Sequence, residues 1–95
     1  MRHYFAPRFE RDYRKLFRKE QEAVDRAIET LLRYLARELE LPHGLGMKRL
    51  AGDYWEIRTS LHTRIIFELA DPIGFLLVGS HEDVKRFIKS GRTTP

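Results

Sequence analysis

The apolar residues of the first forty positions recur at the three- and four-residue spacing of amphipathic helices. They form one stripe to about Arg18 and a longer one to about Glu40. The members are Phe9, Tyr13, Leu16 and Phe17, followed by Ala23, Val24, Ala27, Ile28, Leu31, Leu32, Leu35 and Leu39. Pro7 suits the first turn of a helix, where a backbone N–H is not needed. The pattern predicts two antiparallel helices joined by a tight turn near Lys19.

After a loop at residues 42–46, the apolar period changes to the two-residue period of strands. Three runs rich in β-branched and aromatic residues predict strands at residues 54–59, 64–69 and 73–79. A short aromatic stretch at residues 2–6 is compatible with an edge strand. Because the links between the three later strands are short, we expect them to pair mostly antiparallel.

Ser80, followed three residues later by Asp83, is an N-cap signature that predicts a last helix at residues 81–89, ended by Gly91. The element order is therefore β-α-α-β-β-β-α. It predicts an α+β fold in which two helices cover one face of a small, mostly antiparallel sheet. We expect a single domain over residues 1–91 and a loose tail at residues 92–95.

Composition narrows the possible functions. The chain has 95 residues, with 18 Lys and Arg against 14 Asp and Glu, and no cysteine. A chain of this size buries one core, so an active site is expected to be a shallow surface groove. Without cysteine there is no disulfide, no thiol nucleophile and no cysteine-based metal site. The apolar runs are too short to cross a bilayer, and a cytoplasmic protein is expected.

Arginine carries most of the positive charge, with 13 residues against five lysines, and asparagine is absent. Few thermolabile amides together with many charges are typical of heat-adapted chains, which favours a thermophilic source. A modest positive charge rich in arginine fits contact with nucleic acid or with an acidic protein, although many ordinary domains have the same balance.

The alternation of side chains suggests a chemical site on the sheet. Along the strand at residues 54–59 it places Trp55 on the core side, and Glu56 and Arg58 on the opposite, open face. A three-residue hairpin loop that keeps the apolar side chains of the next strand on the core side also brings Arg64 to the open face. One carboxylate and two guanidinium groups then cluster.

The strand at residues 73–79 is apolar on both faces, which predicts a central strand whose end brings His81 to the rim of this cluster. A carboxylate, a histidine and paired arginines can cleave RNA without a metal. The 2′-OH attacks the adjacent phosphate, one group accepts its proton, and another protonates the departing 5′-oxygen. The arginines stabilise charge on the phosphate oxygens. Further phosphate contacts are expected from Lys48, Arg49, Lys85 and Arg86.

Residues 47–67, which read MKRLAGDYWEIRTSLHTRIIF, and residues 76–84, which read LLVGSHEDV, resemble the RelE/ParE superfamily of toxins from toxin–antitoxin pairs. The most specific part is KRLAGDYWEIR at residues 48–58, followed six residues later by an arginine that opens an apolar strand. The resemblance implies the element order given above, an antitoxin encoded nearby and, in many members, cleavage of messenger RNA in the ribosomal A site. Other members instead poison DNA gyrase, and some have lost a known activity.

Within this resemblance, Arg64 matches the family's strand arginine and Arg58 the basic position before it. His81 lies where members carry a catalytic arginine or histidine. Glu56 together with an arginine and a histidine resembles the YoeB-like branch of the family. Phe87 is a departure, because it falls near the position of a catalytic tyrosine in several members and a phenyl ring has no hydroxyl.

Each candidate residue also has a purely structural interpretation. Glu56 and Arg58 are compatible with cross-strand ion pairs of exposed residues. His81 is compatible with a solvent-facing residue in the first turn of a capped helix. A basic stripe on the first helix, which could also contact ribosomal RNA, is compatible with a solvated face; it comprises Arg8, Arg11, Lys15 and Arg18. No spacing of the remaining histidines argues for a metal site: His3, His43 and His62.

The favoured function is a toxin of a type II toxin–antitoxin pair that acts as a metal-independent, ribosome-dependent mRNA endonuclease without a cofactor. Its expected partners are a cognate antitoxin, the ribosome and mRNA. The protein itself is expected to form either a homodimer or a hetero-oligomer with the antitoxin. The alternative is a non-catalytic ParE-like toxin that binds gyrase, or a module that binds only its antitoxin, and the missing tyrosine favours it. A non-toxic RNA-binding protein ranks last, because only Tyr54 clearly offers an aromatic ring on the open sheet face.

Overall fold

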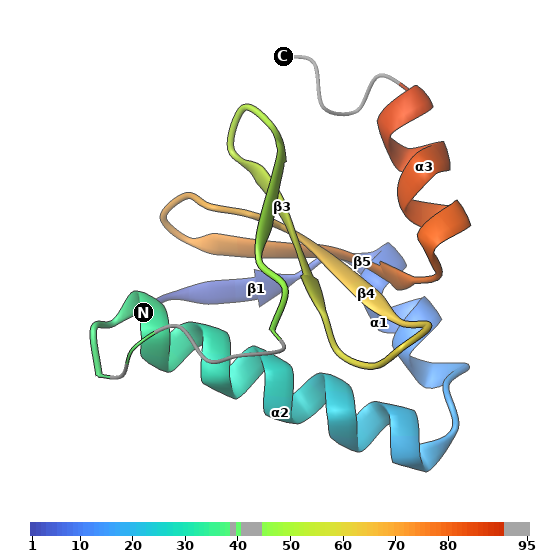
Figure 1. Cartoon of the computed structure of the whole chain (residues 1–95), viewed down its shortest axis with the longest axis horizontal. Helices are drawn as coiled ribbons and strands as arrows, with labels where there is room; N and C mark the ends of the chain where they lie inside the picture. Colours follow the sequence, from blue (N-terminus) through green and yellow to red (C-terminus); the bar gives the residue numbers. More distant parts are fainter. Residues whose placement is uncertain (39, 41–44, 91–95) are drawn as a thin grey trace.

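The computed structural model describes residues 1–38, 40 and 45–90, and Figure 1 shows the arrangement of its elements. Most of the predicted loop at residues 42–46 lies outside this part of the chain, as do Leu39, Gly91 and the tail. The elements in order are β1 (His3–Phe5), α1 (Pro7–Arg14), α2 (Arg18–Leu35), β2 (Lys48–Ala51), β3 (Tyr54–Arg58), β4 (Arg64–Glu68), β5 (Ile73–Gly79) and α3 (His81–Lys89). The predicted α+β class is confirmed.

The five strands form one sheet in the order β1-β5-β4-β3-β2. β1 pairs with β5 in parallel, and the other neighbouring strands pair antiparallel. β5 lies inside the sheet and is buried along most of its length, as its apolar residues predict. No sequence pattern indicated β2, which is short and begins with two exposed cations, Lys48 and Arg49.

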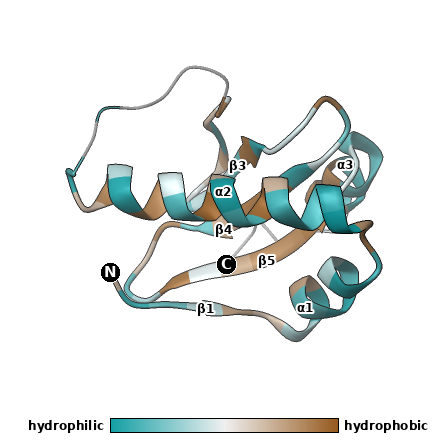
Figure 2. Cartoon of the chain, turned by 90° about the horizontal axis from the view of Figure 1, so that it is seen from below, coloured by the Kyte–Doolittle hydropathy of each residue, from teal (hydrophilic) through white to brown (hydrophobic). Residues whose placement is uncertain are grey.

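The turn between α1 and α2 lies at residues 15–17 rather than near Lys19, as the sequence pattern had indicated. Leu16 is partly buried against the core, whereas Phe17 is the N-cap of α2 and leaves 81% of its surface exposed. Phe17 therefore continued the apolar pattern of the first helix without belonging to its buried side. Figure 2 shows that the chain reverses direction between the two helices.

α2 also ends earlier than its apolar stripe predicts, at Leu35 rather than near Glu40. Shortly after this end, Arg37 has a φ of 63°. This left-handed conformation is the one in which helices commonly terminate. The pattern of apolar positions therefore outlasted the helix by several residues.

The larger core lies between the sheet and the two helices that cover it (Figure 2). It contains Phe9, Val24, Ile28 and Leu31 from the helices, and Ile57, Ile65, Phe67, Ile73 and Phe75 from the strands. Trp55 packs against the same cluster while it is only partly buried. The prediction that Trp55 lies on the core side of the sheet is confirmed, and Ile57, Ile65 and Phe67 lie on the same side.

A smaller cluster holds α3 on the opposite face of the sheet. Val84 and Phe87 of α3 pack with Ile66 of β4 and Leu77 of β5. The ring of Phe87 meets that of Tyr54 edge-on, with 6.0 Å between their centroids. α3 therefore shields part of this face, and the candidate residues on β3 and β4 lie beside it.

The first turn of α3 is fixed by the capping box that the sequence predicts. The backbone N–H of Asp83 donates to Ser80 Oγ at 3.2 Å, and the backbone N–H of Ser80 donates to Asp83 Oδ2 at 2.8 Å. The hydrogen bond from the Ser80 N–H is the main reason why the pKa of Asp83 lies below its ordinary value. None of the described helices has the length and hydrophobicity needed to cross a membrane.

Candidate active site

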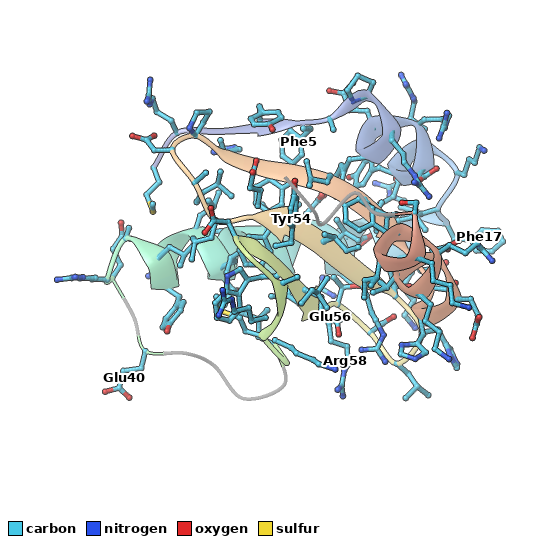
Figure 3. All side chains as sticks on the ribbon, turned by 90° about the horizontal axis from the view of Figure 1, so that it is seen from above. Phe5, Phe17, Glu40, Tyr54, Glu56 and Arg58 are labelled. Carbon is cyan, nitrogen blue, oxygen red and sulfur yellow. The ribbon has the colours of Figure 1, made fainter. Side chains whose placement is uncertain are left out.

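The register of the sheet brings the candidate residues of β3 and β4 together. Arg58 lies directly opposite Arg64, and Glu56 lies opposite Ile66 on β4 and opposite Lys48 on β2. Figure 3 labels Tyr54, Glu56 and Arg58, which alternate with core residues along β3. The predicted clustering of a carboxylate with two guanidinium groups on one face follows from this register.

Glu56 and Arg64 form the centre of the site. Glu56 is 5% exposed, and its Oε2 lies 3.9 Å from Nη1 of Arg64, whose side chain is 20% exposed. The interpretation of Glu56 as an exposed strand residue is therefore wrong. Its burial has a physical reason, because β2 adds a further strand beside β3 and places Lys48 next to it.

Two polar atoms of this pair lack a hydrogen-bond partner among the described residues, Glu56 Oε2 and Arg64 Nε, and both are buried. Leaving a buried donor or acceptor without a partner costs about 1–3 kcal/mol, and more for a charged group. The pair is close enough for electrostatic attraction but not for the bidentate contact that arginine and carboxylate usually make. Buried polar atoms without partners are rare in folded proteins, and a bound ligand is one group that can supply the missing hydrogen bonds.

Arg58 is exposed, and its side chain lies against the backbone of Gly46. A Cβ at Gly46 would lie 3.5 Å from Nε and 3.7 Å from Cζ of Arg58, and Gly46 has a φ of +59°. The backbone N–H of Arg58 donates to the carbonyl oxygen of Leu45 at 2.7 Å. The segment before β2 therefore supports Arg58, and sequence reasoning did not find this role of Gly46.

The hairpin loop before Arg64 is tied to α2. Thr63 is 4% exposed, and its Oγ1 donates to Glu20 Oε2 at 3.0 Å. The backbone N–H of Thr59 donates to the Thr63 carbonyl at 3.0 Å and closes the loop. This support was also missed, because contacts between residues 43 positions apart leave no local signal in one sequence.

His81 is the first residue of α3 and is exposed. Its position is set by the end of β5, where Gly79 pairs with Arg64. Ser80, the N-cap of α3, comes next, and His81 follows it directly. The strand end therefore brings the histidine near the Arg64 end of the site, as expected. Within the described residues, the His81 side chain makes no hydrogen bond or ion pair with Glu56 or Arg64.

The four cations expected at the rim differ in their surroundings. Arg49 Nε donates to the carbonyl oxygen of Gly52 at 2.8 Å, within the turn that joins β2 to β3. Lys85 Nζ lies 3.7 Å from Glu82 Oε1, and Arg86 pairs with Asp83. Lys48 is exposed beside Glu56. Their roles in phosphate binding stay predictions, and Lys48 is the best placed of the four.

Phe87 has a structural role in the fold. It is 5% exposed, and it anchors α3 to the sheet through Ile66 and Tyr54. Tyr54 is partly buried on the same face as Glu56 and carries the aromatic hydroxyl nearest to the site along β3. Among the described residues, no group of three His, Cys, Asp or Glu side chains is arranged to hold a metal ion.

The fold is shared with solved toxin structures. YafQ from E. coli strain BL21(DE3) aligns with 88% of this chain and 98% of its own, at 17% identity and a TM-score of 0.64. The RelB–RelE antitoxin–toxin complex from Methanococcus jannaschii aligns with 87% and 95%, at 22% identity and a TM-score of 0.66. The YoeB dimer from Staphylococcus aureus aligns with 85% and 97%, at 20% identity and a TM-score of 0.63.

The sequence itself matches no family model and no curated protein. The chain therefore has the fold of the YafQ, YoeB and RelE toxins, which the motif at residues 47–67 and the element order predict. At this level of identity the comparison establishes the fold. The fold that the resemblance to the RelE/ParE superfamily implies is therefore confirmed.

Proposed function

We propose that this protein is the toxin of a type II toxin–antitoxin pair and cleaves messenger RNA on the ribosome without a metal. Three observations support the proposal: the toxin fold, the Glu56–Arg64 pair and the nearby Arg58. Action on translating ribosomes implies a cytoplasmic location. A cognate antitoxin is the expected partner, as in the RelB–RelE and DinJ–YafQ complexes.

The pair of unpartnered atoms is the observation that carries the proposal. Among the residues that the structure describes, Arg64 Nε is a donor without an acceptor, and Glu56 Oε2 is an acceptor without a donor. At a cleavage site, RNA supplies both missing partners, since a phosphate oxygen accepts from an arginine and a 2′-OH donates to a carboxylate. Binding would require the Arg64 side chain to turn outward, toward the solvent that it already partly reaches.

The expected reaction is internal transfer of the phosphate. The 2′-oxygen forms a bond to phosphorus while the bond to the 5′-oxygen breaks, which leaves a 2′,3′-cyclic phosphate and a free 5′-hydroxyl. Glu56 accepts the proton of the 2′-OH, and His81 gives a proton to the leaving 5′-oxygen. Arg64, assisted by Arg58, stabilises the charge that develops on the phosphate oxygens. The reverse assignment of acid and base uses the same residues.

Controlled expression in a host cell tests the proposal. Induction of the wild-type protein is expected to stop growth and to produce cuts at codons in the ribosomal A site, mapped by primer extension. Arg64→Ala is expected to remove both effects. Arg33→Ala is the matched control, because Arg33 lies in the last turn of α2, where it pairs with Glu38, and has no role in the candidate site. Growth arrest without cleaved mRNA would contradict the nuclease.

The burial of Phe87 favours one alternative, a toxin that acts by binding alone. Phe87 packs into the sheet and offers no hydroxyl, so the site lacks the tyrosine of several family members. In that case the Glu56–Arg64 pair is structural, and the target is gyrase or only the antitoxin. Growth arrest that persists in Arg64→Ala, together with inhibited supercoiling by purified gyrase, would favour this alternative.

A further inference from the structure

The turn between α1 and α2 exposes the aromatic ring of Phe17, which does not pack in the core and does not cap the helix by a hydrogen bond. Phe17 is 81% exposed, more than any other large apolar side chain among the described residues. It is the N-cap of α2, a position where Ser, Thr, Asp and Asn are preferred because their side chains accept a hydrogen bond, and Phe17 makes none. Figure 3 shows its ring projecting away from the body of the protein.

Three cationic residues flank Phe17 in the sequence. Lys15, Arg18 and Lys19 all lie within two residues of Phe17 and are exposed. The side chain of Arg18 is 93% exposed, and its acidic neighbour Glu22 is 3.9 Å away, the distance of a loose surface pair. An exposed aromatic ring among cations is the combination that single-stranded nucleic acid uses, because bases stack on the ring and phosphates contact the cations.

The turn is fixed next to the candidate active site. Glu20, in the first turn of α2, accepts the hydrogen bond of Thr63, the residue before Arg64. A cavity of about 320 Å³ at this end of the molecule is lined by three parts of the chain: Asp12, Lys15, Leu16 and Glu20 around the turn, His62 and Thr63 of the hairpin loop, and residues 78–80 with Asp83 around the start of α3. Each of the three carboxylates in this lining already has a partner: Glu20 accepts from Thr63, Asp12 lies near Arg8 and Arg11, and Asp83 contacts Ser80 and Arg86.

We propose that Phe17 is a stacking site for a base of single-stranded RNA, and that Lys15, Arg18 and Lys19 bind the adjoining phosphates. This inference rests on the proposed function, since it assigns the turn to the part of the RNA that leaves the site past Arg64 and His81. Phe17 is a binding residue that holds the substrate in place and takes no part in the chemistry.

Fluorescence anisotropy with a labelled, 2′-O-methylated single-stranded oligoribonucleotide tests the proposal, because this probe lacks the attacking hydroxyl and is not cleaved. Phe17→Ala is expected to weaken binding about 5- to 150-fold, the range for loss of one stacked base. Phe17→Trp is expected to keep the affinity, and Phe17→Leu to lose it as alanine does. Leu61→Ala is the control, since Leu61 is a comparably exposed apolar residue.

Two results would overturn the stacking site: affinity in Phe17→Ala equal to that of the wild type, or affinity fully kept in Phe17→Leu. The second result would indicate an apolar surface for a protein partner. The assay separates this inference from the nuclease. If Phe17→Ala loses binding but the wild type cleaves no mRNA, the stacking site is supported and the nuclease proposal fails. If the wild type cleaves mRNA but Phe17→Ala binds normally, the nuclease is supported and the stacking site fails.

Discussion

Thr63 Oγ1 donates a hydrogen bond of 3.0 Å to Glu20 Oε2, and this contact joins the hairpin loop before Arg64 to the first turn of α2. Two elements from opposite halves of the chain are thereby fixed at the end of the sheet where Arg64 lies. The side chain of Thr63 is buried, so the loss of its hydroxyl leaves the Glu20 carboxylate without this donor.

Thr63→Val is expected to lower the free energy of unfolding by about 1–3 kcal/mol, because it keeps the shape of the side chain but removes a hydrogen bond to a charged acceptor. Denaturant unfolding measures the change. A double-mutant cycle with Glu20→Gln isolates the contact, and we expect the two substitutions to be non-additive. Strictly additive effects would mean that the contact does not stabilise the fold.

Trp55 and Phe67 are direct neighbours across β3 and β4 on the core side of the sheet. Phe67 is fully buried, so Phe67→Ala is expected to cost about 3–5 kcal/mol of stability. Trp55 is only partly buried, and Trp55→Ala is expected to cost less than Phe67→Ala. Thermal or denaturant unfolding of the two variants checks the order. A larger loss of stability for Trp55→Ala than for Phe67→Ala would mean that Trp55 contributes more contacts than its partial burial indicates.

The capping box of α3 predicts a pH dependence of stability. The pKa of Asp83 is lowered, chiefly by the Ser80 N–H, from an ordinary value of 3.8. Because the pKa is lowered in the folded protein, the ionised carboxylate stabilises the fold at pH values above its ordinary pKa. This contribution is lost as the pH falls through the pKa of the folded state. Asp83→Asn should therefore lower the melting temperature near neutral pH, and the difference from the wild type should narrow in acid. A difference that does not change with pH would exclude this origin.

The antitoxin proposed above is expected to bind the open face around the rim cations, so its association rate should fall as the salt concentration rises. Lys48 lies beside Glu56, whereas Lys85 already pairs with Glu82. Lys48→Glu should therefore slow association more than Lys85→Glu does, as measured by stopped-flow fluorescence with the product of the adjacent gene.

Binding that is indifferent to salt and to these charge reversals would place the antitoxin interface elsewhere. The helical side of the molecule offers a second surface, a cavity of about 380 Å³ between α1 and α2. Its apolar lining consists of Phe5, Phe9, Tyr13 and Ile28. If the antitoxin bound there, truncation of these side chains, rather than reversal of the rim charges, would weaken its binding.

Much of the fold was predictable because its signals are local. The two helical stripes, the alternation in β3 and β4, and the Ser80–Asp83 cap each act over a few residues. The helix ends and β2 were not predictable in this way. Phe17 and Leu39 continue an apolar pattern beyond helices whose ends are set by packing and by backbone conformation, and β2 is defined by its pairing with β3.

In the candidate site, too, local patterns predicted some residues, whereas others depend on contacts between distant parts of the chain. Alternation places Glu56, Arg58 and Arg64 on one face, and the register of β3 with β4 agrees. The burial of Glu56 depends on β2, which gave no signal of its own. Gly46 and Thr63, which support the two arginines, act through contacts with residues distant in sequence, and no motif marks them.

The support of Arg58 by Gly46 is open to a direct check. Gly46→Ala adds a Cβ at van der Waals distance from Arg58 and strains a backbone with positive φ. Cleavage should slow if Arg58 needs this position, whereas Gly52→Ala provides a control with positive φ and open space around the added Cβ. Equal activity in both variants would show that the position of Arg58 is not important.

Single-turnover cleavage of mRNA on stalled ribosomes tests most directly whether Arg64 and Glu56 act on RNA. With folding verified for each variant, Arg64→Ala should reduce the rate about 10²- to 10³-fold, as removal of one group that stabilises transition-state charge does. Glu56→Gln and His81→Ala should each reduce it about 10²- to 10⁴-fold. Rates for Arg64→Ala and Glu56→Gln equal to that of the wild type would contradict the account, because the buried pair would then be structural.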